Sequence, residues 1–180
     1  MQATDRLQLR EADDADIPEV QRILRAANEP FRDALGAGAF EPYLQMALAV
    51  DDRRSVATVI VAEAGAVAVG TVTYFPDAVA EGWGCPAGHA GIRSMAVHPD
   101  ARRRGVGEAL LAECHRRAVA EGARGVILHT AFFLEDAVRL YERYGFVRDP
   151  QHDVRASDVM ELASPALDYV GMAYRLDLSR

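Results

Sequence analysis

Cysteine is scarce in this sequence, with only Cys85 and Cys114 among its 180 residues. Two cysteines cannot build a disulfide framework, and neither lies in a C-x-x-C pair or in a Cys/His spacing that is typical of zinc sites. His129 and the neighbouring pair His152 and Asp153 also have no partner at metal-ligand spacing in the sequence. We therefore expect a reducing compartment and no metal site.

Long apolar runs are absent as well. The longest, over residues 56–75, is interrupted by one glutamate and two glycines, whereas a membrane-spanning helix needs about 20 consecutive apolar residues. The first residues are charged from Asp5 onward and lack the apolar segment of a secretory signal. These features predict a cytoplasmic protein without a membrane partner.

Positive charge is in short supply too. Arginine and lysine total 20 against 27 aspartates and glutamates, which leaves a net charge of -7. Nucleic acids and anionic membranes bind basic surfaces, so neither is an expected partner. Half of the residues are apolar, which is ordinary for a globular protein and too many for a disordered one.

No repeat, low-complexity run or linker divides the chain, so residues 1–180 are predicted to form a single domain. Apolar periodicity predicts strands and helices along it. The expected order is a strand (Arg6–Arg10), a helix that begins after Asp13, a helix (Gly38–Val50), three strands (Val56–Ala62, Val67–Phe75 and Ala90–Val97), a helix from Gly105 to Gly122, a strand (Val126–His129), a helix around Ala137–Tyr144, and two strands (Phe146–Val147 and Asp168–Leu178). Loops are expected over Pro76–Gly88 and Asp149–Ser164. The fold class is therefore a mixed α/β one, with an antiparallel first half.

The turn before the longest predicted helix has the character of an anion site. The start of a helix carries backbone N–H groups without an intrahelical partner, and glycines such as Gly105 and Gly107 let an anion approach them. Three preceding arginines add attraction, although a run of charge at a turn is more often simply solvated. A phosphate or pyrophosphate is the expected ligand.

Two other phosphate-binding motifs are excluded by the same residues. No G-x-x-x-x-G-K-[ST] string occurs, so a Walker loop is absent. The dinucleotide fingerprint G-x-G-x-x-G fails because Leu110 stands where its third glycine belongs.

Two segments of the chain, IRSMAVHPDARRRGVGEALLAECHRRA and AVRLYERYGF, resemble a pair of family signatures. The first is similar to the acyl-CoA-binding signature [Q/R]-x-x-G-x-[G/A] of the GCN5-related N-acetyltransferases (GNAT family), and AVRLYERYGF resembles the other conserved segment of that family. The resemblance implies a mixed sheet of about seven strands, splayed between the fourth and fifth and flanked by about four helices. It also implies an enzyme that moves an acetyl group from acetyl-CoA to an amine by direct attack.

The resemblance assigns residues to the co-substrate, position by position. The backbone amides that would cradle the pyrophosphate are those of Arg102, Arg103, Arg104, Gly105, Val106 and Gly107. The backbone that would hold the pantetheine arm, like an added strand, is that of Met95, Ala96 and Val97. Such pairing needs an open strand edge, which the splay would provide.

Tyr141 matches the tyrosine that protonates the departing thiolate in the family. A phenol with a pKa of about 10 stays protonated at neutral pH and can donate to a thiolate whose own pKa is about 8.5. Tyr141 also shares an apolar stripe with Ala137 and Leu140, so a core tyrosine is the alternative interpretation.

The base that would take a proton from the amine is less plainly marked. Many relatives carry a glutamate at the position of Gly91. His89 and Arg93 flank it on the same strand face, so His89 is the predicted base and Arg93 a candidate clamp for a substrate carboxylate. Solvated rim residues are the alternative for both. Leu134 replaces an asparagine that contacts the pantetheine arm in many relatives.

Two functional alternatives follow from these departures. One is a non-catalytic acyl-CoA-binding or sensing module. Within the enzyme class, a protein or peptide acceptor competes with a small amine, and the acidic chain favours a cationic acceptor. Dimers are common in such families, so a homodimer is a further expectation.

Overall fold

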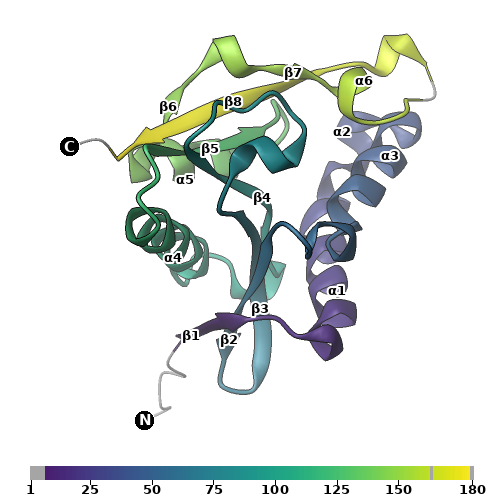
Figure 1. The fold of residues 1–180 in the computed structure, drawn as a ribbon. Helices are drawn as coiled ribbons and strands as arrows, with labels where there is room; N and C mark the ends of the chain where they lie inside the picture. The colour runs from purple at the N-terminus through teal and green to yellow at the C-terminus, as the bar shows by residue number, and fades with distance from the viewer. Residues whose placement is uncertain (1–6, 163, 179–180) are drawn as a thin grey trace.

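A single mixed sheet runs through the computed structural model, which describes residues 7–162 and 164–178 (Figure 1). Its strands are β1 (Leu7–Glu11), β2 (Thr58–Ala64), β3 (Val67–Phe75), β4 (His89–Val97), β5 (Gly125–Thr130), β6 (Val147–Arg148), β7 (Val154–Arg155) and β8 (Val170–Asp177). They follow the order β1-β2-β3-β4-β5-β8-β6, with β7 paired to β8. Only β4 and β5 pair in parallel among the described strands. The predicted mixed sheet with an antiparallel first half is confirmed, and the short β7 lies in the stretch that was expected to be a loop.

Helices cover both faces of this sheet. They are α1 (Ile17–Asn28), α2 (Arg32–Leu35), α3 (Ala37–Leu48), α4 (Val106–Ala120), α5 (Glu135–Tyr144) and α6 (Ala156–Val159). In Figure 1, α1 and α3 lie on one side of the strands and α4 on the other. None of the helices in the described part of the chain has the length and apolar character needed to cross a membrane.

The two faces explain why β2 is apolar at nearly every position. Ile60 and Ala62 belong to one core cluster, together with Leu110 of α4. Val59 and Val61 belong to a second cluster, which is built on α1 and α3. Strands that are covered on both faces have continuous apolar runs rather than an alternating pattern.

The helix ends lie close to where their local signals place them. Asp13 accepts a hydrogen bond from the N–H of Ala15 at 2.8 Å and starts the turn that leads into α1. Gly122 and Gly145 follow α4 and α5 with φ of 74° and 110°, in the left-handed region that glycine adopts without a steric penalty.

β4 and β5 diverge halfway along β4. Their pairing starts at His89 with Gly125 and ends at Ile92 with Leu128. Just beyond, Ser94 has a φ of 49° and the register with β3 shifts, which marks a bulge. A bulge bends its strand, so the second half of β4 leaves β5 and opens a cleft. The predicted splay is confirmed.

Side chains from outside the sheet hold this bulge. The hydroxyl of Ser94 donates to the backbone oxygen of Ala47 at 3.1 Å and accepts from Arg53 at 3.1 Å. Burial lowers the pKa of the Arg53 guanidinium to about 10, and it stays charged at neutral pH. The bend in β4 is therefore tied to α3 and to the turn that follows it.

Candidate active site

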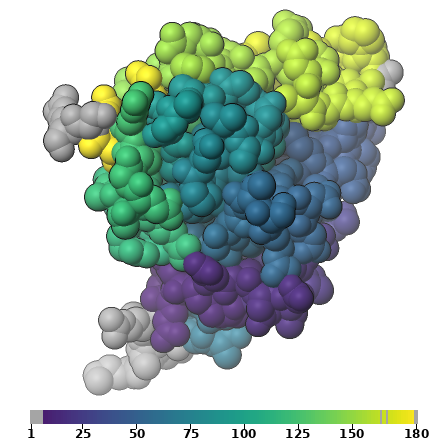
Figure 2. Space-filling model, viewed as in Figure 1, coloured from purple at the N-terminus to yellow at the C-terminus, as the bar shows by residue number. Residues whose placement is uncertain are grey.

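The cleft between the diverging strands leads into a cavity of about 120 Å³. Residues from both halves of the chain line it, and those used below are Tyr43, Met46, Glu81, Trp83, Arg93, Met95, His129, Tyr141, Met160 and Tyr169. Figure 2 shows the residues that follow β3, in teal, covering the middle of the molecule between α4 in green and the C-terminal segment in yellow-green. This cover contains the short 3-10 helix η4 (Ala78–Glu81).

The start of α4 has the backbone geometry that the anion-site prediction requires. Gly105 precedes the helix with a φ of 79°, and no atom lies within 4 Å of the place where a β-carbon would stand. The hydrogen-bond ladder of α4 begins with Ala109, whose N–H donates to Gly105 at 3.0 Å. The amides of Val106, Gly107 and Glu108 therefore have no partner within the helix and are free to bind an anion.

The three arginines before the helix differ in their surroundings. Arg102 donates to the backbone oxygen of Ala27 at 3.1 Å and so ties the turn to α1. Arg103 and Arg104 are exposed, and Arg103 has a φ of 62°. A non-glycine residue in the left-handed region is uncommon and marks a backbone held in shape by its surroundings.

The two signature segments meet where α4 packs against α5. A β-carbon on Gly107 would lie 2.9 Å from Cδ2 of Leu140. Glycine at this position therefore lets the start of α4, from the first segment, lie directly against α5, from the second.

Met95, Ala96 and Val97 form the half of β4 that β5 no longer covers. Ala96 and Val97 pair with Thr71 and Gly70 of β3, and none of the three pairs with β5. Met95 also lines the cavity. The edge of β4 that faces the splay is the kind of open edge to which an extended chain can add.

Tyr141 has features of both interpretations that the sequence leaves open. It is only 6% exposed and belongs to the core cluster under α4, with its ring centroid 5.9 Å from that of Phe146. It also lines the cavity. Burial raises the pKa of its hydroxyl well above the usual value, so the phenol is protonated at neutral pH.

His89 lies at the start of β4, opposite Gly125. Its Nδ1 is 3.3 Å from the backbone oxygen of Ala87, and the residues that line the cavity do not include it. Arg93, four positions on, does line the cavity, but its guanidinium is paired with a carboxylate.

That carboxylate belongs to Glu81, which the sequence did not single out. Its Oε1 occupies the space above Gly91, 2.2 Å from where a β-carbon of that residue would stand. Its Oε2 accepts a hydrogen bond from Arg93 at 2.7 Å. The structure thus supplies a carboxylate beside position 91 from a different element. No signal in the sequence pointed to it, since Glu81 lies in the expected loop.

Glu81 is almost fully enclosed, with a side chain that is 1% exposed. Burial raises the pKa of its carboxyl group, and Arg93 partly opposes this rise. The guanidinium of Arg93 in turn lies 3.4 Å above the ring of Trp83, a cation-π arrangement.

His129, at the end of β5, completes this wall of the cavity. Its Nε2 donates to the backbone oxygen of His152 at 2.8 Å, and its Nδ1 is buried without a hydrogen-bond partner. Burial lowers the pKa of the imidazole below its ordinary value, so the ring is neutral at neutral pH. The ring of Trp83 contacts it at a centroid distance of 5.1 Å.

The family comparison matches most of the chain. Residues 20–146 match the model described as the acetyltransferase (GNAT) family. No curated protein matches the sequence.

Several solved structures share the fold. The PaiA N-acetyltransferase from Thermoplasma acidophilum, crystallised with coenzyme A, is 12% identical with a TM-score of 0.70, over 96% of this chain and 99% of that one. The ribosomal-protein-alanine N-acetyltransferase from Brucella melitensis is 23% identical with a TM-score of 0.65, over 95% and 99%. A GNAT family acetyltransferase from the same organism, in complex with acetyl-CoA, is 22% identical with a TM-score of 0.58, over 79% and 84%.

Proposed function

This chain belongs to the GNAT acetyltransferase family, and from that premise we propose that it transfers the acetyl group of acetyl-CoA to an amine by direct attack. One observation carries the proposal. The start of α4, with its free amides, lies beside Val97, and Met95 on the same uncovered half of β4 lines the cavity together with Tyr141. These three parts correspond to the pyrophosphate, the pantetheine arm and the thioester.

The co-substrate fits the residues that would hold it. The space beside Gly105 is open, and the adjacent amides lack helix partners. The backbone of residues 95–97 offers hydrogen bonds to the arm along the edge that β5 leaves uncovered. Acetyl-CoA, when bound, supplies an acetyl thioester.

Tyr141 acts as the proton donor in this proposal. As the amine nitrogen bonds to the acetyl carbon and the carbon–sulfur bond breaks, the phenol proton passes to the departing thiolate. Because its pKa is raised by burial, the hydroxyl is in its protonated form at neutral pH before the reaction. No covalent intermediate on the protein is needed.

Two residues are candidates for the group that takes a proton from the amine. An alkylamine is neutral only on the order of one part in a thousand at pH 7, so an acceptor is useful. The sequence predicts His89. Glu81 is the second candidate, because it lines the cavity and its Oε1 lies over Gly91 without a hydrogen-bond partner.

The apolar part of the cavity lining favours an amine that is carried on an apolar body. This part includes Tyr43, Met46, Met160 and Tyr169. Tyr43 and Tyr169 both pack on the ring of Phe133, at centroid distances of 5.3 and 5.7 Å. Apolar and aromatic linings bind ligands chiefly by burying apolar surface.

A thiol-release assay tests the proposal. The purified protein is incubated with acetyl-CoA and a panel that includes alkylamines, arylalkylamines, polar amines and short peptides, and free coenzyme A and the acetylated product are measured. We expect turnover, greatest with the apolar amines. The chain has no lysine, so acetylation of its own side chains does not add to the background.

The non-catalytic alternative gives a different result in the same experiment. A sensing module binds coenzyme A in a calorimeter but releases no thiol with any amine. That outcome would overturn the proposed transferase activity while leaving the co-substrate site in place.

A further inference from the structure

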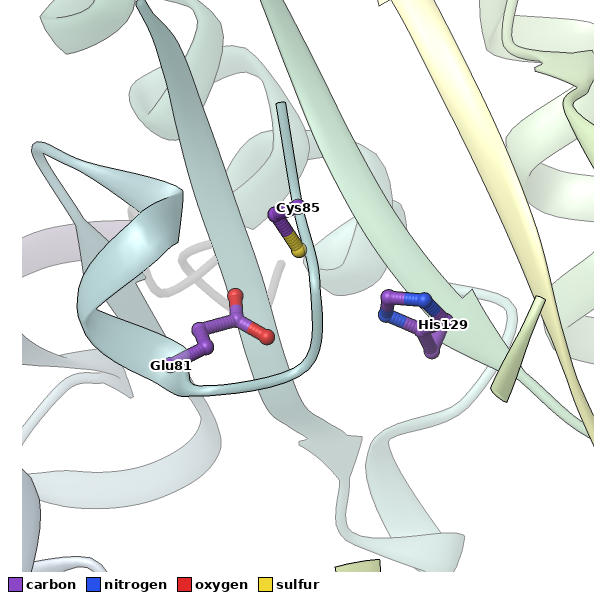
Figure 3. A group of neighbouring side chains, drawn as sticks. All are labelled: Glu81, Cys85 and His129. Carbon is purple, nitrogen blue, oxygen red and sulfur yellow. The ribbon is translucent and has the colours of Figure 1, made fainter. Parts of the chain in front are cut away.

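Three side chains with metal-binding atoms point toward one another (Figure 3), and two of them, Glu81 and His129, line the cavity. Glu81 comes from η4, Cys85 from the segment between η4 and β4, and His129 from β5. One ligand atom of each lies within 4.8 Å of those of the other two. Neither signature segment includes these three residues. From their spacing in the sequence we expected no metal site.

Glu81 and His129 each have a potential metal-binding atom without a partner inside the protein. Oε1 of Glu81 and Nδ1 of His129 are both buried and make no hydrogen bond. The Glu81 side chain is also only 1% exposed. Buried polar atoms are nearly always satisfied, so two unpartnered acceptors in one cluster of side chains indicate a missing ligand.

The other polar atom of each of these two residues is already engaged. Oε2 of Glu81 is held by Arg93 at 2.7 Å. Nε2 of His129 donates to the backbone oxygen of His152 at 2.8 Å, which places the proton on Nε2 and leaves the lone pair on Nδ1. Metal-binding histidines are oriented by such a hydrogen bond from their second nitrogen.

The third ligand, Cys85, is one of the two free thiols of the described chain and is 7% exposed. It belongs to a small apolar cluster with Ala78, Ile127 and Ala173. These neighbours have no polar side chains that could interact with the sulfur. The carboxylate of Glu81 and the imidazole of His129, which lie near it, are groups that can bind the same metal ion as a thiolate.

We propose that Glu81, Cys85 and His129 bind a divalent transition-metal ion of the zinc type. A sulfur, an imidazole nitrogen and a carboxylate oxygen are the ligands that zinc takes, whereas magnesium and calcium require sets of oxygen atoms. Zinc bonds of about 2.0–2.3 Å place tetrahedral ligands roughly 3.3–3.8 Å apart. The observed separations of up to 4.8 Å require only a small closing of side chains.

Binding proceeds without oxidation or reduction. The S–H bond of Cys85 breaks, its proton passes to solvent, and the sulfur bonds to the metal. The thiolate and the Glu81 carboxylate then balance the two charges of the ion, and Arg93 keeps its hydrogen bond to the other carboxylate oxygen. Glu81 and His129 line the cavity and Cys85 does not, so the fourth metal position opens toward the cavity.

Cobalt provides a direct test, because Co²⁺ replaces zinc and is coloured. The reduced, chelator-treated protein is titrated with Co²⁺, and the absorption spectrum is recorded. We expect one equivalent to produce a near-ultraviolet cobalt–thiolate band together with tetrahedral visible bands, and one equivalent of Zn²⁺ to remove both.

A matched pair of variants assigns the sulfur. Cys85→Ala should abolish the thiolate band, whereas Cys114→Ala, at the other free buried cysteine in α4, should keep it. No thiolate band in the parent protein, or a band that survives Cys85→Ala, would overturn the site. The parent titration decides the matter even if a variant fails to fold.

Thermal melting gives a further readout that does not depend on catalysis. A ligand that binds only the folded state raises its melting temperature, so Zn²⁺ should raise that of the parent and of Cys114→Ala. An equal shift in Cys85→Ala would contradict the assignment. Neither measurement requires acetyl transfer, so a failure of the proposed function and a failure of the metal site are distinguishable.

Discussion

At the scale of single residues, the cleft depends on small groups in unusual settings. Gly105 leaves space open beside free amides, Tyr141 places a hydroxyl in a largely apolar cluster, and Glu81 fills the space above Gly91. A substitution at each of these positions alters only a few atoms, so its effect on activity or binding can be assigned to that side chain.

Tyr141→Phe removes one hydroxyl and keeps the ring in the core. If the phenol protonates the thiolate, the turnover rate should fall by roughly 10²–10⁴-fold, while coenzyme A affinity and the melting temperature change little. Steady-state kinetics and a melting curve on one sample measure both. Near-parental turnover with a stability loss of about 1 kcal/mol would identify a core tyrosine instead.

Gly105→Asp should strongly weaken coenzyme A binding, because it adds a side chain and a negative charge where the pyrophosphate meets the amides. Calorimetric titration measures the affinity. Gly36→Asp is the matched control, since Gly36 also precedes a helix with a positive φ, 70°, and has open space around its β-carbon position. Equal affinities in the two folded variants would remove the glycine turn from the site.

The base is identified in metal-free, chelator-treated protein by comparing Glu81→Gln with His89→Ala, because a metal bound through the free carboxylate oxygen of Glu81 would prevent it from accepting a proton. The variant that removes the base should lose roughly 10²–10⁴-fold in turnover and flatten the acid limb of the pH–rate profile, with coenzyme A affinity retained. The other variant should keep the parental profile. Parental turnover in both would show that water or another group accepts the proton.

At the scale of elements, the site depends on how closely α4 approaches the sheet. A β-carbon on Gly70 of β3 would lie 2.7 Å from Cγ1 of Val106, the first residue of α4, and 3.2 Å from the backbone oxygen of Ala96. The start of α4 therefore rests directly on β3, next to the part of β4 that faces the splay.

Gly70→Ala should push the start of α4 away from β3. Overpacking of this kind costs about 1–3 kcal/mol in the free energy of unfolding, and coenzyme A affinity should fall with it. Urea denaturation measures the stability. Adding Val106→Ala removes the nearest methyl groups and should recover part of the loss, whereas strictly additive effects would show that the two residues do not clash.

At the scale of the whole molecule, ion pairs of arginine with carboxylates span the surface. Arg10 holds the pKa of the Asp16 carboxyl down to about 2, and Arg116 and Arg117 do the same for Glu113. A carboxyl whose pKa is lower in the folded state stabilises the fold above its unfolded value and loses this effect as pH falls.

Stability should therefore decline as the pH falls from about 4.5 toward about 2, which spans the unfolded and folded pKa values of Glu113. Urea denaturation at several pH values measures the decline. Glu113→Gln should show a smaller decline over the same range. An unchanged slope would mean that the pair with Arg116 and Arg117 is too solvated to matter.

Some properties of this protein follow from local sequence alone. The glycine turn, the helices that end at Gly122 and Gly145, and the order of the main strands and helices along the chain were all predicted, because they depend on backbone preference and apolar periodicity over neighbouring residues. The signature around Gly105 belongs to the same class, since adjacent residues form the proposed anion site. A single domain over residues 1–180, a cytoplasmic location and a homodimer stay predictions.

Only the tertiary structure decided which residues from distant parts of the sequence contact one another in the site. Glu81 stands over Gly91 because η4 folds back onto β4, and Cys85 and His129 meet because the strand β5 is laid beside β4. The two pairs are 10 and 44 positions apart along the sequence. Their meeting depends on the path of the chain through the sheet, and contacts of that range leave no periodic or local pattern in the sequence.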